Sequence, residues 1–157
     1  MLGPRRSSVF PAPVRSVLGA GTYVEACDRS RRACGKGISK QLFNILPMIA
    51  EVDGLQSRRL QAHLFEMHPE LSFTVLAGAP MRFNKRTAAG RAERITALRP
   101  AFGDVARLVE HPPAGAQRDD VLDALVGAWT ALRHAANRHL RLGGQRDGRG
   151  LRMEMIA

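Results

Sequence analysis

The spacing of apolar and polar residues predicts that the first third of the chain folds into helices. Thr22-Tyr23-Val24-Glu25 has the form of a capping box, in which the threonine hydroxyl and the glutamate carboxylate each accept a hydrogen bond from a backbone amide. Gly35 supplies the left-handed residue that commonly ends a helix, so we expect a helix over 22–34. Apolar residues at helical spacing follow over 42–52, where Pro47 is expected to separate a short turn from a second helix.

Two short strands and further helices are predicted in the rest of the chain. Alternating side chains over 63–68 predict a strand, which Pro69 ends before a short helix that runs towards Gly78. Further helices are expected over 87–98, ended by Pro100, over 102–110, and over 119–139. Alternation over 151–156 predicts a terminal strand. The pattern therefore indicates a helix-rich α/β chain with too few strands to make a sheet of its own.

Length and composition are those of a single folded domain over 1–157. The chain has 157 residues, of which 45% are hydrophobic, and this is enough to bury a core. Its longest apolar run, from Ile45 to Ala50, falls far short of the roughly 20 residues that cross a bilayer. These figures argue against an intrinsically disordered chain and against a membrane protein.

Arginines carry most of the positive charge of the chain, whose formal net charge is +10. Three of the 24 basic residues are lysines and the rest are arginines, whose planar guanidinium can bind phosphate through two parallel hydrogen bonds. This composition favours a polyanionic partner, and we expect nucleic acid. Solvated surface charge is the alternative explanation.

The two cysteines are expected to be free thiols. Cys27 and Cys34 lie seven residues apart on one predicted helix, which would hold their Cα atoms about 10 Å apart, too far for a disulfide. Free thiols are typical of a reducing compartment, so the sequence predicts a cytoplasmic protein.

Two groups of acidic residues are candidates for chemistry. Glu66 lies in the predicted strand over 63–68. Three aspartates gather at the start of the longest predicted helix, within an arc of about 100°: Asp119, Asp120 and Asp123. A strand carboxylate that meets helix carboxylates is the kind of oxygen-rich site that holds Mg²⁺ or Mn²⁺. Two such ions activate water and stabilise the leaving oxygen in phosphodiester cleavage.

A purely structural role explains the same aspartates. Acidic residues in the first turn of a helix are stabilised by its dipole by about 0.3–1 kcal/mol, without any ligand. The centre of their arc also points away from the apolar side of the predicted helix, as a solvated face does. Residue pattern alone therefore leaves both roles open.

A polar cluster in a glycine-rich stretch is a candidate for phosphate contact. Lys36, Ser39 and Lys40 lie in the segment Gly35-Lys36-Gly37-Ile38-Ser39-Lys40-Gln41, where lysines and exposed amides are suited to a nucleic-acid backbone. The spacing is not that of a phosphate-binding P-loop. A capped loop that packs on the core is the alternative.

Ordered blocks along nearly the whole chain resemble one family, the domain of unknown function 429. They are, in chain order, Leu2–Pro11, Gly35–Gln41, Glu51–Asp53, Phe65–Phe73, Lys85–Arg91 and Asp119–Ala124. Members of the family are regarded as predicted nucleases with a ribonuclease H-like fold. The chain departs from the family pattern at Met48, where a lysine is expected.

The resemblance implies a set of catalytic and metal-binding acids. Glu66, Asp120 and Asp123 would be catalytic and would bind the metal, and Asp119 would assist them or cap the helix. Family members also begin upstream, with one strand that bears an Asp and another that reads roughly Ile-Asp-x-Pro. The resemblance therefore implies the C-terminal part of a ribonuclease H-like domain, N-terminally truncated and without its first strands.

Two functions follow from these observations. The first is a metal-dependent nuclease, expected to be inactive as this truncated chain, with Mg²⁺ or Mn²⁺ on the acids and Lys36, Ser39 and Lys40 on the nucleic acid. The second is a non-catalytic basic nucleic-acid-binding or accessory protein, in which the aspartates only cap a helix.

Overall fold

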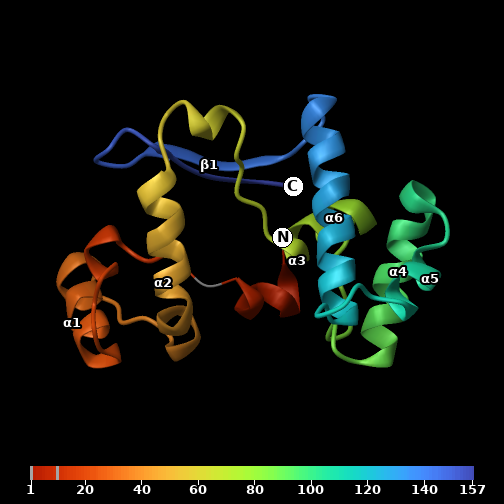
Figure 1. Cartoon of the computed structure of the whole chain (residues 1–157), viewed down its shortest axis with the longest axis horizontal. Helices are drawn as coiled ribbons and strands as arrows, with labels where there is room; N and C mark the ends of the chain where they lie inside the picture. The colour runs from red at the N-terminus through yellow and green to blue at the C-terminus, as the bar shows by residue number, and fades with distance from the viewer. Residues whose placement is uncertain (1, 10) are drawn as a thin grey trace. The chain divides into compact units, whose positions relative to one another are not determined.

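The computed structural model describes residues 2–9 and 11–157, so Phe10 of the first family block lies outside the described residues. Its α-helices are α1 (Tyr23–Cys34), α2 (Lys40–Leu55), α3 (Pro69–Ala77), α4 (Ala88–Phe102), α5 (Val105–Glu110) and α6 (Arg118–Ala135) (Figure 1). Short 3₁₀ turns cover Gly3–Ser8, Arg15–Val17 and Leu60–Ala62, and the antiparallel strands β1 (Arg141–Arg146) and β2 (Arg152–Ile156) end the described chain. A helix-rich α/β chain is therefore confirmed. Among the residues described, no helix is both long and apolar enough to cross a bilayer.

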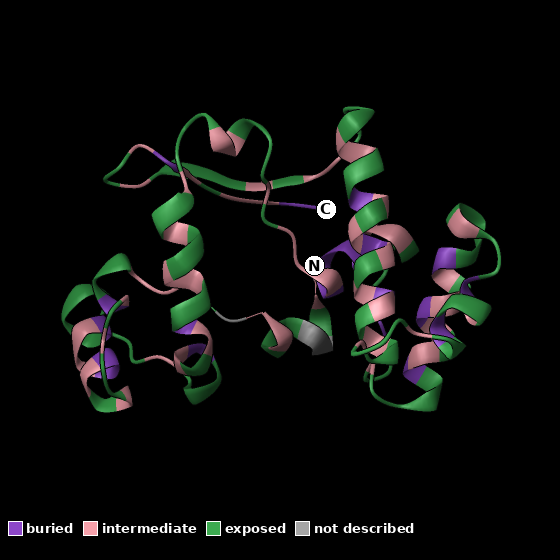
Figure 2. Ribbon diagram, in the orientation of Figure 1, coloured by how far each residue is buried: buried purple, intermediate pink, exposed green. Residues whose placement is uncertain are grey.

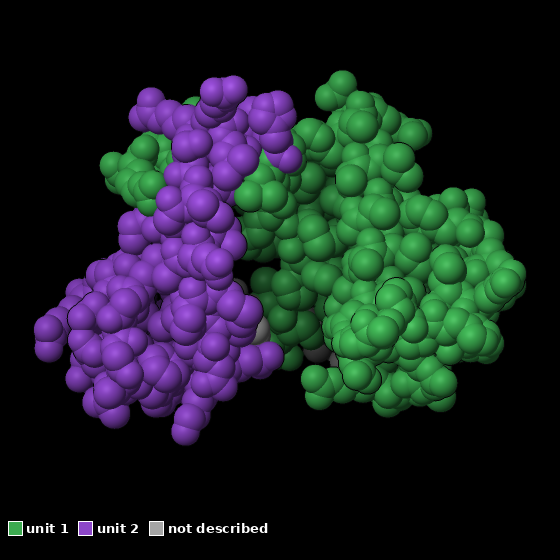
Figure 3. Space-filling view, viewed as in Figure 1, with its two compact units in different colours: residues 1–9, 64–157 green, residues 10–63 purple. Residues whose placement is uncertain are grey.

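The chain divides into two compact units (Figure 3). Residues 10–63 form one of them, here called the 10–63 unit, and it contains α1 and α2. Residues 1–9 and 64–157 form the other, here called the large unit, and it contains α3 to α6 and both strands. A single domain over 1–157 stays a prediction.

The predicted cap begins the first helix of the 10–63 unit, although the return bond of Glu25 goes to Gly21 rather than to Thr22. The Thr22 hydroxyl accepts a hydrogen bond from the Glu25 amide at 3.2 Å, and the Glu25 carboxylate reaches back to the Gly21 amide at 2.9 Å. Gly35 ends α1 with a φ of 73°, in the left-handed region that a residue without a Cβ adopts freely. Cys27 is buried and Cys34 is exposed, and both are free thiols as predicted.

Two prolines lie inside helices that they were predicted to interrupt. Pro47 lies in the middle of α2, which continues to Leu55, and Pro100 lies in the last turn of α4. Both prolines are exposed, so their rings displace no core residue of either helix. Burial of Leu42 and Leu46 in α2 holds the helix to the unit ahead of its proline.

The core of the large unit forms where α3, α4 and α5 each pack against α6. Figure 2 shows the buried positions of these helices on their inner faces. The core residues are Phe73, Met81, Leu98, Val105, Val109, Leu122 and Val126. A buried hydrogen bond from the Thr130 hydroxyl to the Ser72 hydroxyl, 2.9 Å long, also joins α6 to α3.

The predicted strand over 63–68 is wrong. Within it, Met67 makes one isolated parallel bridge to Ile156, whose amide donates to the Glu66 carbonyl at 2.8 Å. The final strand prediction is confirmed as β2, but its partner is β1, in which Gly143 and Gly144 leave little apolar pattern. The longest predicted helix also ends early, at Ala135, where the chain turns through Asn137 with a φ of 54°.

Candidate functional site

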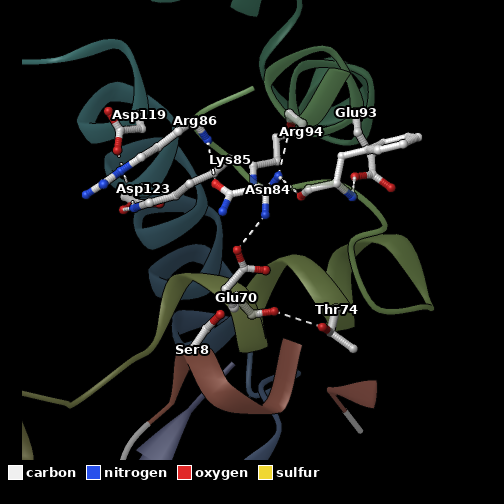
Figure 4. A network of polar contacts seen from close by, with 12 residues as sticks. Ser8, Glu70, Thr74, Asn84, Lys85, Arg86, Glu93, Arg94, Asp119 and Asp123 are labelled. Atoms are coloured by element: carbon white, nitrogen blue, oxygen red, sulfur yellow. Dashed lines mark hydrogen bonds and ion pairs between the residues drawn. The ribbon is translucent and has the colours of Figure 1, made fainter. Parts of the chain in front are cut away.

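Two aspartates of α6 converge on one lysine in the large unit. Asp119 and Asp123 lie one helical turn apart, and both face Lys85, which lies in the loop between α3 and α4 (Figure 4). The Lys85 ammonium donates a very short hydrogen bond to Asp123 Oδ2 and lies 3.7 Å from Asp119 Oδ2. The arrangement is a carboxylate pair with a cationic group held against it.

The carboxyl of Asp123 is partly removed from solvent. Its Oδ1 is buried and has no hydrogen-bond partner among the residues described. Desolvation raises the pKa of Asp123 above its usual value, and the negative charge of Asp119 adds to the rise. The hydrogen bond and the positive charge of Lys85 oppose it. Asp123 therefore has an oxygen poised to accept a further cation or proton.

The other two predicted acids lie in different surroundings. Asp120 Oδ2 accepts from the Gln117 amide at 2.8 Å, which is the capping role of an acid in the first turn. Glu66 is exposed as a residue, no described side chain or amide pairs with its carboxylate, and partial desolvation of that carboxyl raises its pKa. The structure does not bring either of them to Lys85, and their catalytic roles stay predictions.

The loop that carries Lys85 is tied to α4 at several points. Both carboxylate oxygens of Glu93 accept from backbone amides, that of Arg82 at 2.8 and 3.1 Å and that of Phe83 at 3.1 Å. The Thr87 hydroxyl accepts from the Gly90 amide at 3.0 Å and caps the helix. These bonds hold the backbone on both sides of Lys85.

A buried ion pair lies beneath the same loop. The Arg94 side chain, 0% exposed, donates to Glu70 Oε1 of α3 at 2.5 Å. It also donates to the carbonyls of Gly90 and Phe83, at 2.9 and 3.2 Å. Its guanidinium lies 5.4 Å from the centre of the Phe73 ring. Arg94 therefore ties the loop, the start of α4 and α3 together (Figure 4).

The donor chemistry of the aspartate pair fits a divalent cation. Asp119 and Asp123 already share one cationic group, and the buried Asp123 Oδ1 has no partner among the described residues. Mg²⁺ is usually held by one or two carboxylates, with waters and substrate phosphates completing its octahedron. Over the described residues, no group of three or more His, Cys, Asp or Glu is placed to hold a metal ion. The fit is therefore to a two-carboxylate site.

The predicted phosphate-contact cluster lies in the 10–63 unit. Ser39 caps α2 by accepting from the Leu42 amide at 3.1 Å, and the Lys40 ammonium lies 6.0 Å from the centre of the Tyr23 ring. Lys36 is exposed, and its carbonyl accepts from the Cys34 thiol at 3.8 Å. The structure thus gives Ser39 a capping role, and the contact of these residues with nucleic acid stays a prediction.

Sequence reasoning missed Lys85 and Arg94. Arg94 left a signal in its spacing, because it lies four residues from Gly90 and four from Leu98 on one side of the predicted helix. The structure buries all three residues. A charge in the middle of a buried stripe requires a buried partner. Lys85 left no local signal beyond its place in a family block.

The titration of Asp123 has a consequence for stability. Because its pKa is raised in the folded chain, the folded state binds this proton more tightly than the unfolded state. The stability that the residue contributes therefore falls as pH rises from about 3.9, the ordinary aspartate pKa, through the raised value. We expect Asp123→Asn to gain stability relative to the native chain over that window, measured by urea unfolding between about pH 4 and 7. A stability difference that does not change with pH would contradict this prediction.

A family model described as Protein of unknown function (DUF429) matches residues 1–147 of the chain. The match covers the Lys85 loop, the aspartate pair and the cluster over 36–40. No curated protein and no solved structure matches the chain.

Proposed function

The chain belongs to the family described as Protein of unknown function (DUF429), and on that premise we propose that it is a metal-dependent phosphodiesterase that acts on nucleic acid. The proposal includes a ribonuclease H-like fold for the family and Mg²⁺ or Mn²⁺ as the cofactor. It places the metal on Asp119 and Asp123, where the family resemblance implied Glu66, Asp120 and Asp123, with Asp119 assisting them or capping the helix.

One observation carries the proposal: two carboxylates of a family block share one cationic group, and one of their oxygens is buried without a described partner. Asp119 and Asp123 would hold the ion through hard oxygen atoms, of which Asp123 Oδ1 has no competing hydrogen bond. A divalent ion held there would polarise a phosphate oxygen and lower the pKa of a bound water. Asp123 binds a cation only when it is ionised, so its raised pKa moves the onset of metal binding to higher pH.

The neighbouring residues position the pair. Asp120 caps the start of α6 and so fixes the turn from which Asp119 projects. The Thr130–Ser72 bond and the core beside it hold α6 against α3. Exposed arginines elsewhere on the chain would attract the polyanion, and the formal net charge of +10 supports this.

The test compares two single substitutions on α6 that change neighbouring carboxylates in the same way. Calorimetric titration with Mn²⁺ should give a binding heat with the native chain and with Asp120→Asn, whose side-chain oxygen can still accept from the Gln117 amide. It should give none with Asp123→Asn. Any cleavage of labelled single-stranded and duplex DNA and RNA in Mn²⁺ should follow the same order. Equal Mn²⁺ heats for all three proteins, or no heat for any of them, would sink the proposal.

A second candidate function is binding of nucleic acid without cleavage. The excess of 24 basic over 14 acidic residues favours it, together with the capping role that Asp120 shows. In that case Asp123→Asn would bind oligonucleotides as the native chain does, and Mn²⁺ would promote no cleavage by either.

A further inference from the structure

The Lys85 ammonium occupies the place beside the two carboxylates that a metal ion would take. Its ammonium contacts Asp123, lies 3.7 Å from Asp119, and is partly buried between them and the loop. A divalent ion on the same two carboxylates would repel this ammonium at short range, in surroundings that water screens poorly. The lysine and a metal ion therefore compete for one place.

The backbone that carries Lys85 is fixed, whereas its side chain is long. Glu93 holds the amides of Arg82 and Phe83, Thr87 caps α4, and the Asn84 side chain accepts from the Arg86 amide at 3.0 Å. A lysine ends in a compact ammonium on a flexible four-carbon stem. Lys85 can therefore move its charge by several ångströms without any change in the turn 84–86.

Arg86 gives the same turn a second cation. Arg86 is exposed, and its guanidinium makes no hydrogen bond or ion pair with the residues described. Figure 4 shows the side chains of Lys85 and Arg86 running from the turn towards α6. A planar guanidinium beside a mobile ammonium suits the oxygens of a phosphodiester.

We propose that the turn 84–86 is the phosphate-binding element of the site, and that Lys85 exchanges partners within it. With no divalent ion bound, Lys85 pairs with Asp119 and Asp123. When the ion binds, the ammonium leaves the carboxylates and contacts the substrate phosphate beside Arg86. This inference rests on the proposed function, because it needs a divalent ion on the aspartate pair.

The exchange couples two binding events. A divalent ion drives the ammonium towards the phosphate, and a bound phosphate draws the ammonium away from the carboxylates. Each ligand therefore strengthens the binding of the other, by the same factor in both directions. Removal of the lysine should tighten metal binding while it weakens phosphate binding, and a merely structural lysine would do neither.

The experiment uses the whole chain with Lys85→Met and Arg86→Gln, and with Arg99→Gln as the matched control, an exposed arginine in the last turn of α4. Circular dichroism establishes that each variant folds, and Lys85→Gln, which also removes the charge, replaces Lys85→Met if methionine prevents folding. Mn²⁺ alone is titrated by calorimetry. A labelled single-stranded oligodeoxynucleotide is titrated in Ca²⁺, at several salt concentrations.

We expect Lys85→Met to bind Mn²⁺ at least about threefold more tightly than the native chain, because the competing charge is gone. Lys85→Arg keeps the charge, so it should bind Mn²⁺ as the native chain does. Lys85→Met and Arg86→Gln should each weaken oligonucleotide binding and lower its salt dependence by about 0.7, the value for one lost phosphate contact on a single strand. Arg99→Gln should change neither measurement by more than about twofold.

Different results contradict the partner exchange, the proposed function and the phosphate-binding role of the turn. If the native chain binds Mn²⁺ and Lys85→Met binds it no more tightly, the exchange is wrong and the proposed function stands. If no protein binds Mn²⁺, both are wrong. If Arg99→Gln weakens oligonucleotide binding as much as Arg86→Gln, the turn is not a phosphate-binding element.

Discussion

Replacement of Arg94 by methionine is expected to lower the free energy of unfolding by about 3–5 kcal/mol. The side chain is fully buried, and its loss leaves the Glu70 carboxylate charged in the core without its partner. It also removes the side-chain donor that the carbonyls of Gly90 and Phe83 share. Urea unfolding at neutral pH, followed by circular dichroism, measures the loss.

The control separates the broken pair from the lost volume. The double variant Glu70→Leu with Arg94→Met removes both charges, so it should lose less stability than Arg94→Met alone. Arg99→Met, at an exposed position of the same helix, should change stability by no more than about 0.5 kcal/mol. A loss of less than about 1 kcal/mol in Arg94→Met would show that the pair does not hold the loop.

The helix ends were predictable because their signals are local. Thr22 and Glu25 cap α1 through amides within four residues, and Gly35 and Gly78 end their helices with φ values of 73° and 71°. A cap involves neighbours in the chain, so a short stretch of sequence contains both of its partners.

The continuity of α2 and α4 depended on packing that the sequence does not display. A proline costs an interior helix about 3 kcal/mol, and that cost predicts a break. Pro47 and Pro100 both face solvent, and the buried side chains on the opposite faces of their helices hold each helix together. Which side of a helix is buried is decided by the neighbouring helices.

The strand error has a related cause. Alternation over 63–68 describes an extended segment, but a strand also needs a neighbour to pair with. β2 pairs with β1 along its length, and Met67 receives a single bridge. The two glycines of β1 hide that strand from an apolar pattern, so the partner of β2 was not visible in the sequence.

The candidate site was predictable in its residue types and not in its pairing. Asp119 and Asp123 lie four residues apart, about 40° around the helix, and Asp120 and Asp123 lie about 60° apart, so pattern alone does not separate the two pairs. The contacts of Lys85 single out Asp119 and Asp123, and Lys85 lies far from these aspartates in the chain. A long-range contact of this kind is set by how α4 packs on α6.

Substitution of alanine for Gly90 is expected to cost about 3 kcal/mol, at the upper end of what overpacking costs. A Cβ at this position would lie 1.9 Å from the Asn84 carbonyl oxygen and 2.5 Å from its carbon, so the backbone itself must move. The better helix propensity of alanine offsets at most about 1 kcal/mol of this loss of stability. Thermal and urea unfolding of the variant measure the net loss.

Gly127→Ala is the matched control, because a Cβ there meets no atom within 4 Å in the middle of α6. That variant should gain up to about 1 kcal/mol from helix propensity, so the two identical substitutions are expected to change stability in opposite directions. The clash at Gly90 also moves the turn that carries Lys85, so Gly90→Ala should alter Mn²⁺ affinity and Gly127→Ala should not. If Gly90→Ala were as stable as Gly127→Ala, the close approach of α4 to the turn would be wrong, and the fixed position of Lys85 would lose its physical basis.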